Sequence, residues 1–248
     1  MKLLKETFGK ANRILFLDIE GTQIQHEVIE IGAVLVGING KHQIDDSVEQ
    51  VVFREFCVAH EPIGKIVTEM TGLTEETLSK KGKTFEDAMR ELNKIIGSLG
   101  DNLIVATFGN QDEKMLTNSL KFYEENQFVK SFVSYLTNRI WDFSSFINNY
   151  IKNDHNQALS LLKLLDKFGL KEYGKAHDPV NDAMNLCNIY GKMVTSSDIL
   201  AEEYLKVLHH NHGQLINSPV VRKYMDRLVC GENIKFKDFS EELKKYFE

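Results

Sequence analysis

The pattern of apolar positions along the chain predicts five strands. Three apolar runs follow one another at the front, at residues 13–19, 28–37 and 50–58, and two more lie at residues 103–108 and 140–143. Each run is short, rich in Ile, Val, Leu or Phe, and bounded by turn residues, which is typical of strands. We therefore expect a five-stranded sheet whose first two strands lie at hairpin distance.

Helical spacing occurs between and after these runs. Thr84-Phe85-Glu86-Asp87 has the form of a capping box and predicts a helix that ends near Gly97. Two further helices are expected at residues 156–168 and 179–194, the second beginning with a proline at its first position. The inward positions expected in the first of these two are Ala158, Leu161, Leu162, Leu165 and Phe168.

The order of these elements predicts the fold class. Three strands followed by strand–helix alternation indicate an α/β domain with a mixed sheet flanked by helices. From residue 195 onward the pattern is helical without strands and ends in an amphipathic stretch at 239–247. We therefore expect a main domain at 1–194 and a helical C-terminal appendage at 195–248, for which dimerisation or partner docking is one interpretation.

The charge balance disfavours a passive nucleic-acid-binding protein. The chain has 36 acidic and 30 basic residues and a net charge of −6. No overall basic field attracts a polyanion, but this balance is compatible with an enzyme whose metal ions meet the phosphate.

Cysteine usage and hydropathy indicate a compartment. Cys57, Cys187 and Cys230 are odd in number and widely spaced, so they match neither a disulfide framework nor a zinc site. No apolar run is long enough to cross a bilayer, and the first residues do not resemble a signal peptide. The expectation is a cytoplasmic protein without a membrane partner.

Two acids lie two positions apart at the end of the first strand, in Phe16-Leu17-Asp18-Ile19-Glu20-Gly21-Thr22. Alternate residues of a strand face the same side, so Asp18 and Glu20 are expected to point together. Two acids on one face of a buried strand repel each other unless a cation lies between them. The alternative is that the strand ends at Asp18 and both acids are solvated turn residues.

A third acid follows the fourth strand, in Phe108-Gly109-Asn110-Gln111-Asp112. Aspartate is a favoured N-cap, so Asp112 taken alone is interpreted as the cap of the next helix. Asn110 in the cap position would instead leave the Asp112 carboxylate available for another role.

The third segment is His177-Asp178-Pro179-Val180-Asn181-Asp182. Asp178 followed by proline predicts an N-cap and the first helical residue. His177 is then in the preceding loop, where it is well placed to take a proton from water unless it is an ordinary surface histidine. Asp182 lies about one turn inside the helix, where the helix dipole is expected to keep it ionised.

Together these segments predict one pocket built from distant parts of the chain. Four carboxylates with no nearby arginine require cations to stay ionised. Two divalent metal ions would supply them, and two-metal carboxylate sites cleave phosphodiesters.

These residues and their order resemble the DEDDh 3′–5′ exonucleases, which have the ribonuclease-H-like fold. Asp18 and Glu20 match the first motif, Asp112 the middle acid, and His177 with Asp182 the last motif. The form Phe-Gly-x-x-Asp around the middle acid is similar to the ERI-like branch. Two further stretches resemble the family's second strand and its recurrent Thr-Gly-Ile-Thr, namely Glu30-Ile31-Gly32-Ala33 and Thr71-Gly72-Leu73-Thr74. Pro179 and Gly21 depart from the commoner residues without touching a matched acid.

The resemblance implies a mechanism and a substrate. The four acids would hold two Mg²⁺ or Mn²⁺ ions, and His177 would activate a water that releases nucleoside 5′-monophosphates from single-stranded DNA or RNA 3′ ends. Oxygen donors suit these hard ions, and the lack of a Cys/His cluster argues against zinc. Thr22 and Ile24 would lie near the terminal nucleotide, although plain packing also accounts for Ile24.

Two rival functions remain at this point. The first motif and the last also resemble a haloacid-dehalogenase-type phosphatase with Asp18 as nucleophile. That interpretation places Glu20 where an aspartate is required and gives Asp112 no role. The other rival is a catalytically inactive nucleic-acid-binding module, which would be expected to have lost one of the five residues. We therefore predict a metal-dependent 3′–5′ exonuclease.

Overall fold

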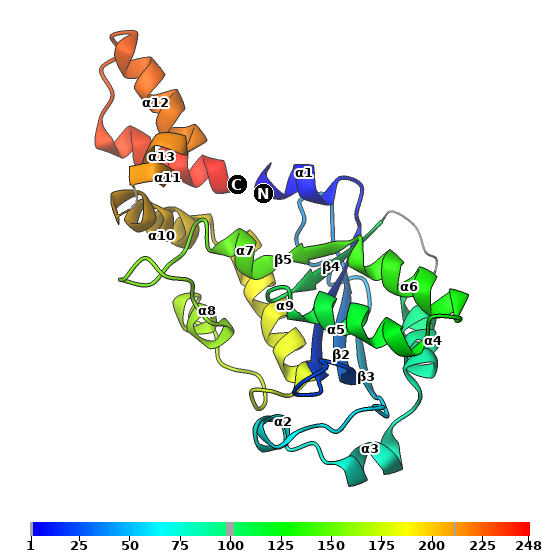
Figure 1. Ribbon diagram of the computed structural model, residues 1–248. Coiled ribbons are helices and arrows are strands. Elements are labelled where there is room, and N and C mark those ends of the chain that lie inside the picture. The colour runs from blue at the N-terminus through cyan, green and yellow to red at the C-terminus, as the bar shows by residue number, and fades with distance from the viewer. Residues whose placement is uncertain (1, 98–101, 211) are drawn as a thin grey trace.

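The computed structural model describes residues 2–97, 102–210 and 212–248, and its centre is a five-stranded sheet (Figure 1). The strand order is β3-β2-β1-β4-β5. The strands are β1 (Arg13–Gly21), β2 (Val28–Gly37), β3 (Val51–Phe56), β4 (Leu103–Thr107) and β5 (Ile140–Asp142). All five predicted strands are therefore present, and the predicted mixed sheet is confirmed.

Strand β1 lies in the middle and sets the two faces of the sheet. It pairs antiparallel with β2 and parallel with β4. Ile14 and Phe16 belong to the hydrophobic cluster on one face, whereas Leu15 and Leu17 belong to the cluster on the other. By the same alternation, Asp18 and Glu20 continue the first face beyond Phe16.

Helices cover both faces. The face of Ile14 and Phe16 is covered by α9 (Pro179–Thr195), with α7 (Phe143–Ile147) and α8 (Leu161–Lys167) in the same cluster. The opposite face is covered by α4 (Phe85–Ile96) and α6 (Gln127–Thr137). The helix α5 (Gln111–Ser119) follows β4 and contacts β1. The remaining short elements are η1 (Lys2–Leu4), α1 (Lys5–Phe8), α2 (Lys65–Thr71), α3 (Glu75–Lys81) and η2 (Leu120–Phe122).

Capping follows the sequence signals at two helices. The Thr84 hydroxyl accepts a hydrogen bond from the Asp87 amide at the start of α4, and Gly97 follows its last residue. The Asp178 carboxylate accepts from the Asn181 amide at the start of α9, with Pro179 in the first turn. Both predicted helix starts are confirmed.

The helix predicted over residues 156–168 is present only at Leu161–Lys167, so the prediction is wrong for residues 156–160. Asn156 has φ +60, a left-handed conformation that cannot belong to a helix. Just before it, the Asn153 carboxamide accepts from the amides of His155 and Gln157 and holds the chain in a loop. The helix α8 begins only after Ser160, and Leu162, which was expected to face inward, is exposed.

The C-terminal helices extend away from the sheet (Figure 1). They are α10 (Ser197–His210), α11 (His212–Asn217), α12 (Pro219–Val229) and α13 (Phe236–Phe247). One hydrophobic cluster runs from the sheet face through α9 into α10 and α13, so these helices are packed onto the main core. The division at residue 195 stays a prediction.

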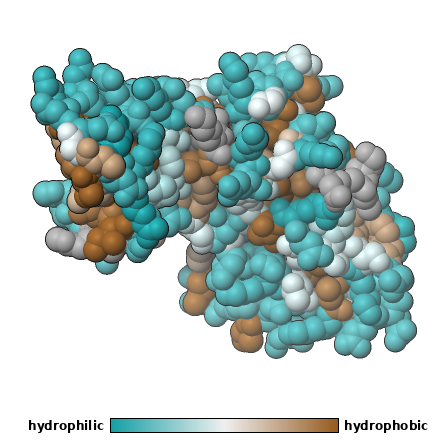
Figure 2. All heavy atoms as spheres, turned by 90° about the horizontal axis from the view of Figure 1, so that it is seen from above, coloured by the Kyte–Doolittle hydropathy of each residue, from teal (hydrophilic) through white to brown (hydrophobic). Residues whose placement is uncertain are grey.

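Several large apolar side chains are exposed on the C-terminal helices (Figure 2). They include Ile216, Met225, Leu228, Val229 and Phe236. Among the described residues, no helix combines the length and apolarity that crossing a membrane requires.

Candidate active site

The first two acids lie on the end of β1 and face the same side. Strand β1 continues to Gly21, and both Asp18 and Glu20 are partly exposed while Ile19 between them is buried. The alternative that the strand ends at Asp18 is therefore wrong. In the antiparallel register with β2, Asp18 lies opposite Gly32 and Glu20 lies opposite Glu30. Directly paired residues share a face, so Glu30 adds a third carboxylate beside the first two.

Asp112 reaches β1 from the first turn of α5. The N-cap position is occupied by Asn110, so the interpretation of Asp112 as the cap is wrong. One oxygen of the buried Asp112 carboxylate accepts a hydrogen bond of 2.9 Å from the Ile19 amide. This bond fixes Asp112 between the residues of the first motif.

Asp182 approaches from the first turns of α9. A Cβ on Gly32 would lie 2.2 Å from the carbonyl carbon of Pro179, so only glycine lets the start of this helix rest on β2 at that point. The Asp182 amide donates to the Asp178 carbonyl oxygen at 2.9 Å, which places Asp182 one turn inside the helix as predicted. Three distant segments thus bring their acids to one edge of the sheet.

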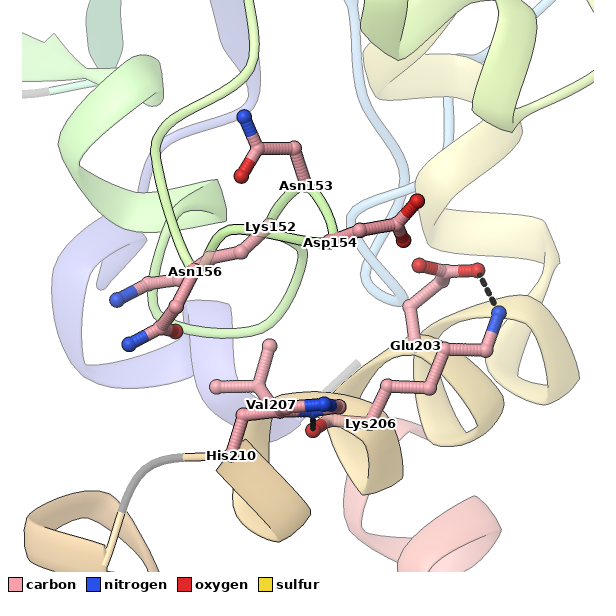
Figure 3. A pocket seen from close by; sticks show the side chains of 8 residues that line it. All are labelled: Lys152, Asn153, Asp154, Asn156, Glu203, Lys206, Val207 and His210. Carbon is pink, nitrogen blue, oxygen red and sulfur yellow. Dashed lines mark hydrogen bonds and ion pairs between the residues drawn. The ribbon is translucent and has the colours of Figure 1, made fainter.

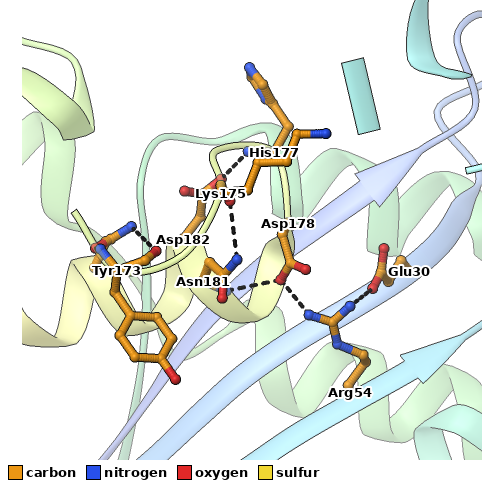
Figure 4. Close-up of polar contacts among 9 residues, drawn as sticks. Glu30, Arg54, Tyr173, Lys175, His177, Asp178, Asn181 and Asp182 are labelled. Atoms are coloured by element: carbon orange, nitrogen blue, oxygen red, sulfur yellow. Dashed lines mark hydrogen bonds and ion pairs between the residues drawn. The ribbon is translucent and has the colours of Figure 1, made fainter. Parts of the chain in front are cut away.

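His177 lies in the loop before α9, as predicted, and is exposed. Its backbone has φ +59, and its amide donates to a carboxylate oxygen of Asp182 at 3.0 Å. In Figure 4 the imidazole points away from that carboxylate. The ring is therefore accessible to solvent.

Burial raises the pKa of the acids at this site, and repulsion between carboxylates adds to the shift. Burial, followed by repulsion from Asp112, Asp182 and Glu20, holds the pKa of Asp18 well above its usual range. Burial together with the charge of Asp182 raises the pKa of Glu20 to about 7. Burial also raises the pKa of Asp112 to about 7, against the opposing hydrogen bond from Ile19. Ionising the whole group without a cation is therefore unfavourable.

The pKa of Asp182 is higher than the sequence predicts. The helix N-terminus was expected to keep it readily ionised, but burial raises its pKa, and the hydrogen bond from the His177 amide offsets only part of this effect. The favourable helix dipole is a modest effect, and here the loss of water outweighs it.

The donor chemistry of the site fits hard divalent ions. Asp18, Glu20, Asp112 and Asp182 offer only carboxylate oxygens, the ligands that Mg²⁺ and Mn²⁺ prefer. In the part of the chain that the structure describes, however, no group of three or more His, Cys, Asp or Glu side chains is arranged as a metal-binding cluster. The acids share one electrostatic environment without forming a ready coordination sphere.

The two predicted substrate-binding residues differ in exposure. Thr22 is 1% exposed, and its hydroxyl accepts from the Glu27 amide at 3.0 Å, which closes the turn after β1. Ile24 is 80% exposed at the tip of that turn and lines a hollow of about 250 Å³ with Pro62 and Gly64. A substrate role remains a prediction for both.

Glu30 and Arg54 were missed as site residues. The Arg54 guanidinium lies between Glu30 and Asp178, so the expectation of no nearby arginine is wrong (Figure 4). Glu30 was recognised only as part of the second strand, and Arg54 lay unremarked within the run predicted as the third strand, residues 50–58. The register that places them beside the first motif is a tertiary property.

The mixed sheet flanked by helices, with acids at the end of β1 and at the starts of α5 and α9, has the ribonuclease-H-like fold. The model of the RNase T exonuclease family matches residues 6–190, and the chain belongs to this family. The chain is therefore a nuclease, and the resemblance to the DEDDh exonucleases is confirmed.

Solved structures share this fold at low sequence identity. The nuclease domain of 3′hExo, a DEDDh family member bound to rAMP, is 18% identical with a TM-score of 0.58, over 76% of this chain and 94% of that one. Cell-death related nuclease 4 (CRN-4) is 16% identical with a TM-score of 0.58, over 75% of this chain and 64% of that one. Exonuclease I of E. coli in complex with a dT13 oligonucleotide is 17% identical with a TM-score of 0.55, over 83% of this chain and 46% of that one. No curated protein matches the chain significantly.

Proposed function

We propose that this nuclease is a divalent-metal-dependent 3′–5′ exonuclease that releases nucleoside 5′-monophosphates from single-stranded DNA or RNA. The observation that carries the proposal is the meeting of Asp18, Glu20, Asp112 and Asp182 at one edge of the sheet, where burial raises the pKa of all four and their repulsion adds to the shift of Asp18 and Glu20. Acids buried together without a neutralising side chain must either keep protons or bind cations, and divalent ions allow all four to ionise.

Each acid has a defined part in holding two Mg²⁺ or Mn²⁺ ions. Asp18 and Glu20 offer oxygens from the rigid end of β1, Asp112 from the start of α5, and Asp182 from the start of α9. When bound, the two ions would lower the pKa of a water and neutralise charge on the phosphate. Because the strand and the two helix starts are packed into the hydrophobic core, small side-chain adjustments would bring the four donors onto the ions when these bind.

His177 is the proposed general base. An imidazole nitrogen takes a proton from the attacking water, whose oxygen forms the new bond to phosphorus. The bond between phosphorus and the 3′ oxygen of the preceding nucleotide breaks, and that oxygen takes a proton from solvent. The products are a nucleoside 5′-monophosphate and a chain shorter by one nucleotide.

The direction and the type of end are supported by the structural neighbours. The nuclease domain of 3′hExo is bound to rAMP, and exonuclease I of E. coli is in complex with a dT13 oligonucleotide. Ile24, exposed at the turn after β1, is placed to contact a terminal base. The three cysteines are unpaired, which supports a reducing, cytoplasmic location as part of the proposal.

The phosphatase alternative loses its basis. It left Asp112 without a role, whereas the Asp112 carboxylate binds the backbone beside Asp18 and shares its electrostatic environment. Membership in the exonuclease family accounts for both motifs at once. An inactive binding module is an outcome that the following experiment decides.

The test is digestion of 3′-labelled and 5′-labelled single-stranded DNA and RNA with Mn²⁺, beside an Asp182→Ala variant. We expect stepwise shortening from the 3′ end, abolished by EDTA and by the substitution. Shortening from the 5′ end, or internal cleavage, would refute the direction. Binding without cleavage of either polymer by the folded protein would establish the inactive module instead.

A further inference from the structure

Arg54 links two acids that flank the candidate active site. Its guanidinium donates one hydrogen bond of 2.9 Å to Glu30 on β2 and another to Asp178 at the start of α9 (Figure 4). Arg54 lies opposite Gly32 in the register between β2 and β3, next to the point where α9 rests on the sheet. The arginine therefore joins the sheet to the first turn of the helix.

Asp178 connects Arg54 to the backbone of helix α9. The same carboxylate oxygen that binds Arg54 accepts the capping hydrogen bond from the Asn181 amide at 3.1 Å. The orientation of the N-cap, and with it the start of α9, is thus defined by a residue of the sheet. The second hydrogen bond, from Arg54, further restricts the rotamers that the Asp178 side chain can adopt while it caps the helix.

The residues on either side of Asp178 are those of the proposed chemistry. His177 has φ +59, which is uncommon for a residue other than glycine and persists only where the surroundings fix it. Its amide is held by Asp182, whose own amide is held by the Asp178 carbonyl oxygen. Three consecutive contacts run from Arg54 to His177 and Asp182.

We propose that Arg54 is a positioning residue, which ties the N-cap of α9 to the sheet and so holds His177 and Asp182 in register with Asp18 and Glu20. This inference rests on the proposed function for its catalytic consequence, but not for its structural one. The planar fork of arginine serves two acceptors at once, which the single ammonium of lysine does not reproduce.

The ion pair with Asp178 is not mainly a source of stability. The side chains of Arg54 and Asp178 are 37% and 27% exposed, and exposed ion pairs contribute little to folding. What such a contact does provide is a fixed orientation. Glu30, the other partner of Arg54, is only 4% exposed, so Arg54→Met also removes the partner of a buried acid and costs stability. The signature to measure is therefore a loss of position without a large loss of stability in Asp178→Ser, which keeps the pair between Arg54 and Glu30.

Amide hydrogen exchange of the full chain, without metal or substrate, measures that position directly. In Arg54→Met and in Asp178→Ser, which keeps a favoured N-cap residue, we expect the His177 and Asp182 amides to exchange about fivefold faster. Arg54→Lys should give an intermediate value. Lys83→Met removes the neighbouring ion pair with Glu55 and should leave both amides unchanged. Unchanged exchange in Arg54→Met would overturn the inference.

Kinetics provide a second readout. We expect Arg54→Met to lower kcat by about 10- to 100-fold at nearly unchanged KM, as is usual for residues that orient a site from outside it. In an Asp178→Ser background, Arg54→Met should cause little further loss. Wild-type kcat in an active Arg54→Met enzyme would refute the positioning role. No cleavage by the wild-type chain would instead refute the proposed function, while the exchange result would still decide the role of Arg54.

Discussion

Two buried carboxylates in this molecule have opposite surroundings. Glu203 on α10 is 8% exposed and receives a hydrogen bond of 3.0 Å from Lys167. A second hydrogen bond of 2.6 Å comes from Lys206, one turn further along the same helix (Figure 3). Burial alone would raise the pKa of Glu203, but these two lysines lower it below its usual range. Asp112 is 5% exposed and has other carboxylates as neighbours, and its pKa is raised to about 7.

The difference separates a structural acid from a functional one. Where a carboxylate only joins helices, the chain supplies the neutralising cations itself. At the end of β1, within the described part of the chain, four acids have no lysine partner, and the arginine beside them binds Glu30 and Asp178. The fold supplies no positive charge to neutralise these four carboxylates. They can therefore all be ionised only when cations bind from solution.

The largest expected effect on activity comes from neutralising Asp18 at the end of β1, compared with neutralising Glu203 on α10. Asp18→Asn should reduce nuclease activity by on the order of 10³-fold or more. The site loses one negative charge and one carboxylate oxygen that would bind a metal ion. The metal-free Asp18→Asn protein should unfold at a higher temperature than wild type, since one repelling charge is removed. Activity assays and thermal unfolding measure both.

The matched variant is Glu203→Gln. It should keep near wild-type activity and lose about 1–3 kcal/mol in the free energy of unfolding, because two lysines lose their charged partner. If both variants behaved alike in either assay, the distinction between the two carboxylates would be incorrect.

The next effect concerns the proposed base. His177→Gln should lower kcat by about 10²- to 10⁴-fold, the usual contribution of general base catalysis. Its binding of Mn²⁺ should be unchanged, since the imidazole points away from the Asp182 carboxylate. Weakened Mn²⁺ binding would reassign His177 to the metal site.

A smaller effect is expected from pH in the metal-free protein. Burial raises the pKa of Glu20 from 4.5 to about 7, so the folded chain holds this proton more tightly than the unfolded chain. The resulting stability is present below the unfolded pKa and is lost as pH rises through the folded one. The melting temperature should therefore fall between about pH 5 and about pH 7.5, and Mn²⁺ should reverse the fall.

Two controls separate this effect from general titration. Asp18→Asn should flatten the fall, because it removes part of the repulsion. Glu203 affects stability in the opposite direction. Because its pKa is lowered in the folded chain, it stabilises the fold at neutral pH, and this stabilisation is lost on acidification. A melting temperature that rises steadily from about pH 5 to about pH 7.5 in metal-free wild type would contradict the assigned shifts.

The smallest effect is expected at Ile24. Ile24→Ala should raise KM for oligonucleotides only a few-fold, because one exposed side chain contributes little to a substrate contact. Its 80% exposure predicts no change in unfolding temperature. The comparison is with Leu116, which is fully buried in the sheet core and whose substitution by alanine should cost about 2–5 kcal/mol.

Local signals explain how far the sequence predicted the fold. The five strands followed from short apolar runs, and the starts of α4 and α9 from capping residues, because these signals act within a few residues. The helix expected from residue 156 failed for a local reason as well. An asparagine side chain captures the backbone amides there, and apolar spacing does not reveal that competition.

The site was predictable in its acids but not in their environment. Asp18 and Glu20 share a face by strand alternation alone. The role of Arg54 depends on the register of β3 with β2 and on the packing of α9 against Gly32, which no short pattern encodes. The raised pKa of Asp182 likewise depends on neighbours from other segments, which outweigh the local effect of the helix terminus.

The most direct test of the central claim is to count bound metal ions. Mn²⁺ titration followed by electron paramagnetic resonance should give two ions per wild-type chain and at most one in Asp18→Asn, with Glu203→Gln like wild type. Failure of the folded wild-type chain to bind Mn²⁺, or equal binding by Asp18→Asn, would contradict the assignment of the four acids as a metal site.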